Sequence, residues 1–177
     1  MTKLKCVSVV FMAILLLGGC YESDIPLFEP SLQIDKRLTK SWISVPKDSK
    51  NKALSLVVRK FNEREYLAAW KDGHDGATVM ARGFVTKINN VAIMNLQGIA
   101  SLNKNDRTFL FFKYDFNKDG RLVINMLSGD YPKLKDKKFK SPARFRKFIK
   151  KNIDQEGLFD TNIEFKPADD IRFEIKP

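Results

Sequence analysis

The sequence predicts a mainly β (α+β) domain, in which an antiparallel meander forms a small barrel or a sandwich and one amphipathic helix follows near the C-terminus. Three observations lead to this prediction. Between residues 38 and 127, short segments alternate apolar and polar residues with a period of two. Turn residues separate these segments at short intervals. Near residues 141–153 the period changes to that of an α-helix.

The expected strands follow one another through short connections, which favours hairpins and hence a meander. Asn89-Asn90 is expected to form a tight turn, because asparagine tolerates positive φ. Longer loops are expected at 71–77, which contains two glycines, and at 102–106. The segments expected to form strands are 38–45, 53–60, 65–70, 78–87, 91–96, 107–115 and 121–127.

The C-terminal part of the chain predicts the helix and one or two further strands. Ser141-Pro142 supplies an N-cap followed by a proline at the first helical position. Gly157 is expected to stop the helix, and strands are expected at 161–166 and 170–175. An apolar stripe at helical spacing needs a partner surface, so the helix is expected to pack on the sheet. The stripe consists of Phe145, Phe148, Ile149 and Ile153.

The first twenty residues have the parts of an export signal. Two lysines precede an apolar run, 6–17, which is too short to span a membrane as a helix. The run leads into Leu17-Gly18-Gly19-Cys20, and this stretch resembles a bacterial lipobox. The resemblance implies cleavage between Gly19 and Cys20, and acylation of the sulfur and the new amino group of Cys20. An uncleaved anchor helix, or a secretory signal with a chance cysteine, are the alternatives.

The lipoprotein resemblance sets the expected domain organisation and location. Residues 1–19 would be the signal peptide, 20–37 the lipidated cysteine and a tether with two prolines, and 38–177 a single β-rich domain. In enteric bacteria an Asp after the lipidated cysteine retains a lipoprotein at the inner membrane. Tyr21 occupies that position here, so the resemblance favours the outer membrane of the cell envelope.

The positive charge of the chain is concentrated in one segment. The net charge is +11, and residues 133–151 contain ten Lys or Arg and a single acid, Asp136. These cations are a solvated helix face, a surface that meets an anionic partner, or part of a helix lying in the membrane interface. Anionic lipid, lipopolysaccharide or an acidic envelope protein are the expected partners. The proposed basic patch comprises Lys137, Lys138, Lys140, Arg144, Arg146, Lys147, Lys150 and Lys151.

Composition and missing motifs argue against several functions. With two cysteines and one histidine, a zinc site of several Cys or His ligands is not expected, and acylation of Cys20 would remove the last free thiol. No nucleophile elbow, P-loop or zinc-protease motif occurs. Export argues against nucleic acid as a partner. No enzyme activity, cofactor or metal is therefore expected. Glu63 and Glu65 would share one face of a strand, but carboxylates at a turn are normally solvated. A carboxylate pair that is distant in the sequence leaves a hydrolase with an unrecognised carboxylate site as an alternative.

The aromatic run FLFFKYDF, 109–116, has apolar residues on both faces of a strand. Leu110, Phe112, Tyr114 and Phe116 share one face, and Phe109 and Phe111 share the other. This pattern predicts a strand that is covered on both sides, with the basic helix as one cover. The alternative is a ligand cavity lined by Trp70, Phe109 and Phe111.

The stretch DFNKDGRL, 115–122, has oxygen side chains at the spacing of a calcium loop. A calcium-binding EF-hand requires a glutamate at its twelfth position, where this chain has Met126, and it requires flanking helices. The same letters fit a type I turn from Asn117 to Gly120, with Gly120 at the left-handed position of a bulged hairpin. The turn is the favoured interpretation.

The layout is similar to calycin-like small barrels and to small bacterial lipoproteins with a Leu-Phe pair after a late helix, here Leu158-Phe159. The resemblance to calycins rests on an early strand tryptophan, Trp42, followed by an antiparallel meander and a late helix. Lipocalins carry a glycine two residues before this tryptophan, and Lys40 occupies that place here. The sequence therefore predicts a lipid-anchored, periplasm-facing envelope protein with a binding or assembly role. A calycin-like carrier of a small apolar ligand is the first alternative.

Overall fold

The computed structural model describes residues 19–48, 52–73, 76–99, 108–169 and 171. The predicted signal up to residue 18, the predicted loop at 102–106 and almost all of the predicted strand at 170–175 lie outside the described residues.

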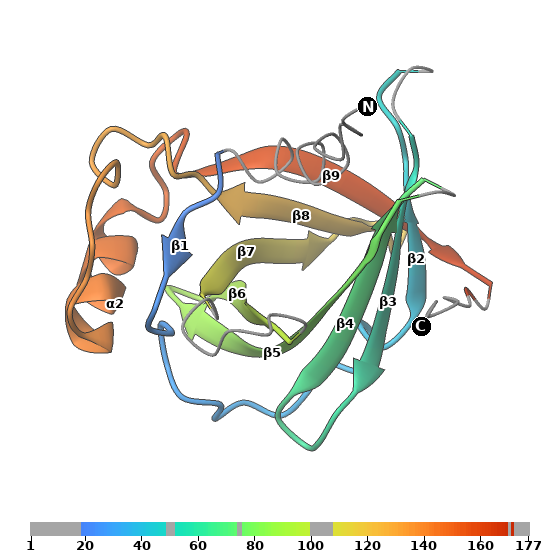
Figure 1. Ribbon diagram of the computed structural model, residues 1–177, viewed down its shortest axis with the longest axis horizontal. Coiled ribbons are helices and arrows are strands. Elements are labelled where there is room, and N and C mark those ends of the chain that lie inside the picture. Colours follow the sequence, from blue (N-terminus) through green and yellow to red (C-terminus); the bar gives the residue numbers. More distant parts are fainter. Residues whose placement is uncertain (1–18, 49–51, 74–75, 100–107, 170, 172–177) are drawn as a thin grey trace, which may run out of the picture.

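Eight antiparallel strands close into a barrel, which confirms the predicted fold class (Figure 1). Each strand pairs with its neighbour in the chain from β2 to β8, and β9 closes the ring by pairing with both β8 and β2. A short ninth strand, β1 (Glu22–Ser23), pairs with β7 outside the ring. The barrel strands are β2 (Ser41–Ser44), β3 (Leu54–Lys60), β4 (Tyr66–Asp72), β5 (Thr78–Ile88), β6 (Val91–Gly98), β7 (Phe109–Phe116), β8 (Leu122–Leu127) and β9 (Phe159–Ala168).

Two of the predicted turns set the register of their hairpins. Asn89 and Asn90 have φ angles of 49° and 68°, and Ile88 pairs with Val91 across this two-residue turn. Gly120 has a φ of 72°, and its amide donates to the carbonyl of Asn117 at 3.0 Å. Both turns are confirmed, and the second accounts for the calcium-like stretch as a bulged hairpin.

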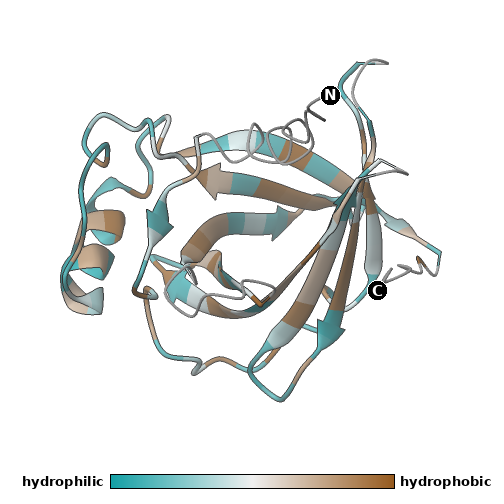
Figure 2. Ribbon diagram, in the orientation of Figure 1, coloured by the Kyte–Doolittle hydropathy of each residue, from teal (hydrophilic) through white to brown (hydrophobic). Residues whose placement is uncertain are grey.

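The interior of the barrel is an apolar core to which every strand of the ring contributes. Figure 2 shows apolar segments on the strands that enclose it. Because side chains alternate across a strand, one set from each strand points inward. The buried members of this inner core are Leu38, Trp42, Leu56, Val58, Tyr66, Val85, Met94, Tyr114, Leu122 and Phe165.

A second core lies on the outer wall of the barrel, under the helix. The helix α2 (Pro142–Asn152) packs there with the N-terminal segment of the described chain, and its Phe145 and Ile149 are fully buried. From the wall come Ile88, Ile93 and Phe111. The predicted packing of the helix on the sheet is confirmed, as is the prediction that β7 is covered on both faces.

The helix occupies the predicted range near 141–153, but it ends without the predicted stop at Gly157. The side chain of Ser141 accepts a hydrogen bond from the backbone N–H of Arg144 at 3.4 Å, and Pro142 opens the helix. Helical structure ends at Asn152, five residues before Gly157. The amide of Gln155 instead donates to the carbonyl of Asn152 at 2.9 Å in a following turn.

Residues 20–30 are packed on the barrel, which differs from the free tether predicted for 20–37. Tyr21 is 8% exposed and Leu27 is fully buried. The amide of Leu27 donates to Oδ1 of Asn95 on β6 at 3.0 Å. The apolar side chains in this segment gain more by covering the outer wall than by staying in water.

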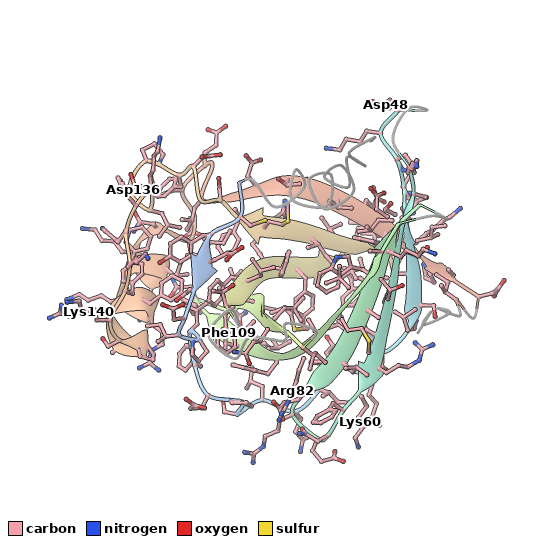
Figure 3. The ribbon with its side chains drawn as sticks, viewed as in Figure 1. Asp48, Lys60, Arg82, Phe109, Asp136 and Lys140 are labelled. Atoms are coloured by element: carbon pink, nitrogen blue, oxygen red, sulfur yellow. The ribbon has the colours of Figure 1, made fainter. Side chains whose placement is uncertain are left out.

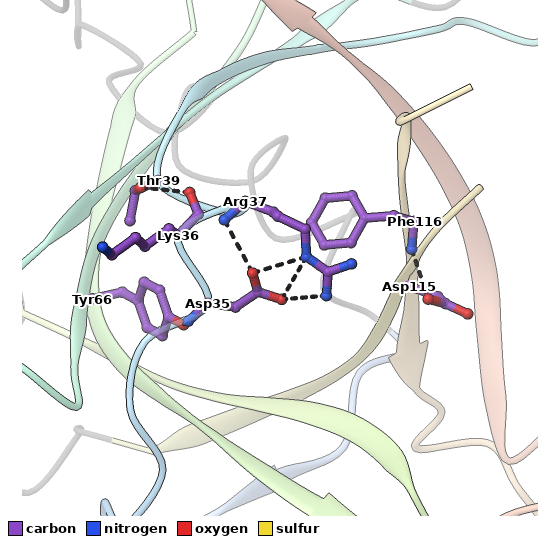
Figure 4. A network of polar contacts seen from close by, with 7 residues as sticks. All are labelled: Asp35, Lys36, Arg37, Thr39, Tyr66, Asp115 and Phe116. Atoms are coloured by element: carbon purple, nitrogen blue, oxygen red, sulfur yellow. Dashed lines mark hydrogen bonds and ion pairs between the residues drawn. The ribbon is translucent and has the colours of Figure 1, made fainter. Parts of the chain in front are cut away.

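Residues 34–39 close one end of the barrel (Figure 4). The carboxylate of Asp35 accepts hydrogen bonds from the backbone N–H of Arg37 at 3.0 Å and from its guanidinium. The Arg37 guanidinium also lies 4.5 Å from the centroid of the Phe116 ring. Leu38, from the same turn, enters the inner core and is 3% exposed. This turn replaces the beginning of the strand predicted at 38–45.

Candidate functional site

Cys20, the predicted lipidation site, lies against the end of β8. It forms an isolated β-bridge with Ser128, and its sulfur lies 3.5 Å from the sulfur of Met126. Burial is the main cause that raises the pKa of the Cys20 thiol, and the charge of Glu22 adds to it. The preceding Gly19 accepts a hydrogen bond from the amide of Gly129 at 2.5 Å. The predicted cleavage site is therefore held close to the body of the domain.

Tyr21 joins Cys20 directly to the basic segment of the chain. Its phenol donates a hydrogen bond to the backbone carbonyl of Lys137 at 2.7 Å. Its ring lies 5.5 Å from that of Phe145 on α2 and 6.4 Å from that of Phe139. Burial is the main cause that raises the pKa of Tyr21 to about 12. Tyr21, the residue after the predicted acylation site, thus holds the basic loop, residues 133–140, against the helix.

The structure brings the basic patch together on one side of the molecule. Figure 3 places Asp136 and Lys140 on the α2 side, far from Lys60 at the end of β3. Arg146 is half-buried, whereas the other seven predicted patch residues are exposed. Lys137 lies 4.9 Å from the centroid of the Phe148 ring, so its charge stays above the helix. Within the described residues, no ion pair neutralises these cations.

The structure does not bring together the three residues predicted to line a ligand cavity. Phe109 and Phe111 belong to the outer core, and Phe111 packs edge-on against Phe145 at 5.0 Å. Trp70 belongs to the inner core. The two phenylalanines lie at odd positions of β7, and the strand alternation turns them to the wall that the helix covers. This lining is therefore corrected, because any ligand inside the barrel would meet Trp70 and Phe112 instead.

Carboxylates and metal ligands are dispersed in the described part of the chain. No group of three or more Cys, His, Asp or Glu side chains converges there, and the single histidine of the chain, His74, lies outside it. Glu63 pairs with Lys60, whereas Glu65 pairs with Arg82. In the calcium-like stretch, Oδ1 of Asn117 accepts from the amides of Asp119 and Arg121 at 3.0 and 2.9 Å. That oxygen serves the turn.

Sequence reasoning missed the role of the aromatic residues in the segment predicted as a tether. Tyr21 organises the basic loop, and Phe28 lies under the guanidinium of Arg146 at 4.2 Å. The presence of Tyr21 and Phe28 in this segment could have indicated that it is packed, because solvated linkers contain few aromatic residues.

No helix in the described residues combines the length and the apolar character needed to cross a membrane. Comparison with protein-family models, with curated proteins and with solved structures found no match to this chain.

Proposed function

We propose that this chain is a lipid-anchored protein of the bacterial cell envelope, with a non-catalytic binding or assembly role, whose basic face meets an anionic surface. The observation that carries the proposal is the hydrogen bond that the phenol of Tyr21 donates to the backbone carbonyl of Lys137. It sets the predicted acylation site beside the basic loop, so acyl chains on Cys20 would bring the exposed cations to the lipid head groups.

Electrostatics supports this orientation. Each cation near an anionic membrane surface contributes about 1 kcal/mol of binding free energy. Residues 133–151 carry ten cations and one acid. Turning this side of the domain toward an anionic surface therefore gives more binding free energy than turning any other side toward it. The anionic partner is phospholipid, lipopolysaccharide or an acidic envelope protein. By the lipobox resemblance, Tyr21 favours the outer membrane over the inner.

Replacing Cys20 with Ser tests the anchor. We expect the variant to lose incorporation of labelled fatty acid and processing of the signal, because serine offers no thiol for the diacylglyceryl group. The measurement is metabolic labelling of cells that express each form. A Cys20→Ser chain that still carried labelled acyl groups would contradict the proposal.

Charge-neutral variants test the basic face. Changing Lys138, Lys140 and Lys151 to Gln removes three exposed cations, and should weaken binding to vesicles with anionic lipid by about one to two orders of magnitude at low salt. The matched control changes Lys36, Lys118 and Lys166, which are exposed elsewhere on the domain, and should bind as the parent does. Equal losses in both variants would show that net charge matters and orientation does not.

Carriage of a small apolar ligand is a second candidate function, favoured by the inner wall of the barrel. Several inward-facing residues are only half-buried, among them Trp70, Leu96, Phe112 and Ile124, so solvent reaches part of an apolar interior. A ligand there should quench Trp70, whereas Trp42 is 1% exposed in the core. Titration with a fluorescent fatty acid should give saturable quenching that Trp70→Phe removes. Absence of saturation up to the solubility limit of the probe would rule this function out.

A further inference from the structure

A hollow of about 260 Å³ lies between α2 and the turn that joins β5 to β6. Phe28 and Ile88 form its apolar part, and Lys87, Arg146, Lys147 and Lys150 surround it with positive charge. None of the described residues that line it carries a carboxylate. Pockets for drug-sized ligands measure about 300–1,000 Å³, so this hollow suits a smaller group.

The walls of the hollow are held by specific contacts. The guanidinium of Arg146 stacks over the ring of Phe28 at 4.2 Å, which restricts the side chain to one region. The Nδ2 amide of Asn89 donates to the carbonyl of Lys150 at 3.4 Å and ties the β5–β6 turn to the helix. Ile88 is 6% exposed and anchors the turn in the outer core.

The three helix cations around the hollow, Arg146, Lys147 and Lys150, repel one another. Arg146 and Lys150 are four residues apart on α2, and Lys147 and Lys150 are three apart, so like charges face one another along the helix. The first turn of α2 has no acidic residue. Within the described residues, none of these three cations takes part in an ion pair. An anion bound between them would relieve this repulsion.

We propose that this hollow binds the phosphate group of a phosphorylated amphiphile. Arg146, Lys147 and Lys150 would donate hydrogen bonds to the phosphate oxygens, for which a guanidinium is well matched in geometry. Phe28 and Ile88 would contact the carbon skeleton next to the phosphate. The assignment of a membrane lipid as the source rests on the proposed orientation of the domain, whereas the recognition of phosphate beside an apolar group rests on the hollow alone.

Calorimetric titration of the full chain in an uncharged detergent tests this site in solution, apart from any membrane. The ligands are a short-chain phosphatidic acid below its micelle concentration, inorganic phosphate, and a short-chain phosphatidylcholine. At about 150 mM salt, where long-range attraction is largely screened, we expect saturable binding of the phosphatidic acid. Inorganic phosphate should bind more weakly. The phosphatidylcholine should not saturate the site, because its phosphodiester carries less negative charge than a phosphate monoester and adjoins a cationic choline.

Two triple variants that lose the same amount of charge distinguish a specific phosphate site from general attraction by the positive charge of the domain. Changing Arg146, Lys147 and Lys150 to Gln should weaken binding of the phosphatidic acid at least about tenfold, since hydrogen bonds to charged groups are lost. Changing Lys138, Lys140 and Lys151 to Gln should alter it by less than about threefold, because these residues do not line the hollow. Arg146→Lys keeps the positive charge but loses the planar guanidinium that can donate two hydrogen bonds to one phosphate, so it should bind the phosphatidic acid more weakly than the parent.

Several results would overturn the site. Equal losses in the two triple variants would reduce the hollow to part of a general positive field. Absence of saturable binding by the parent would exclude a phosphate site, and equal affinity for inorganic phosphate would exclude the amphiphile. The vesicle experiment tests the attraction of the basic patch to a membrane, whereas the calorimetry tests the hollow in solution. Either proposal can therefore fail while the other holds.

Discussion

At the scale of single residues, short-range turn chemistry is what the sequence predicts best. Asn89-Asn90 and Asn117–Gly120 form the expected turns because asparagine and glycine adopt positive φ more easily than other residues. The turn from Asp35 to Leu38 was not predicted, because it depends on an aspartate and an arginine that bond to each other at the mouth of a barrel. The spacing of residues in the sequence does not indicate that this pair lies at the end of a barrel.

Gly120→Ala should destabilise the domain by about 1 kcal/mol, because a side chain at a φ of 72° is strained. The measurement is the free energy of unfolding in denaturant. Gly98→Ala is the matched control, since no atom lies within 4 Å of the added Cβ and its φ is not in the left-handed region. A Gly120→Ala protein as stable as the control would contradict the strained turn.

Glu65→Gln should lower stability at neutral pH by about 1 kcal/mol or less, since Arg82 is half exposed. The hydrogen bond from Arg82 is the largest influence on the carboxyl and holds the pKa of Glu65 below its usual value. A lowered folded pKa gives stability that is present above the unfolded value, about 4.3, and is lost as the pH falls through the folded value.

The difference between parent and Glu65→Gln should therefore close as the pH falls below about 4, as followed by denaturant unfolding at a series of pH values. Glu63→Gln is the control, because Glu63 and its partner Lys60 are both exposed at the surface, where an ion pair contributes little. A difference that stayed constant down to low pH would rule out the ion pair as its cause.

At the scale of elements, the amphipathic helix and its packing against β7 were predictable, whereas the N-terminal part of its docking surface was not. The spacing of Phe145, Phe148, Ile149 and Ile153 is a local property that indicates a helix with one buried face. Its partner surface combines the outer wall of the barrel with Tyr21 and Leu27 from the far end of the sequence. Contacts between such distant segments leave no periodic signal, which is why the part that Tyr21 and Leu27 take in this surface was not predicted.

Phe145→Ala should destabilise the domain by about 3–5 kcal/mol, because the ring is fully buried and its loss leaves a cavity. Its ring contacts those of Tyr21, Phe111 and Phe139. Thermal and denaturant unfolding measure the loss. Phe61→Ala removes a ring that is 54% exposed, and should cost much less. Similar losses from the two substitutions would argue against docking of α2 on the barrel.

At the scale of the whole molecule, the hairpins were predictable and the closure of the ring was not. The pairings from β2 to β8 join neighbours in the sequence, whereas β9 must return past the helix to pair with both β8 and β2. Barrel and sandwich therefore remained equal alternatives in the sequence. The attachment of residues 20–30 to the outer wall depends on the same closure, because it creates the curved surface that they cover.

Leu27→Ala should cost about 2–5 kcal/mol of unfolding free energy, because Leu27 is fully buried between the N-terminal segment and the wall. Gln33→Ala, at an exposed position three residues beyond this segment, is the control and should change little. Denaturant unfolding compares the two. A change within about 0.5 kcal/mol for Leu27→Ala would restore the free tether.

The attachment of residues 20–30 also limits how far the domain could travel. A flexible linker of 17 residues has a root-mean-square span of roughly 20 Å, which would let the barrel sample a wide volume around its anchor. With Tyr21 and Leu27 buried, that freedom is absent. If Cys20 is the anchor, as proposed, the domain would work only on molecules that come to the bilayer surface itself, and would have no reach toward the cell wall.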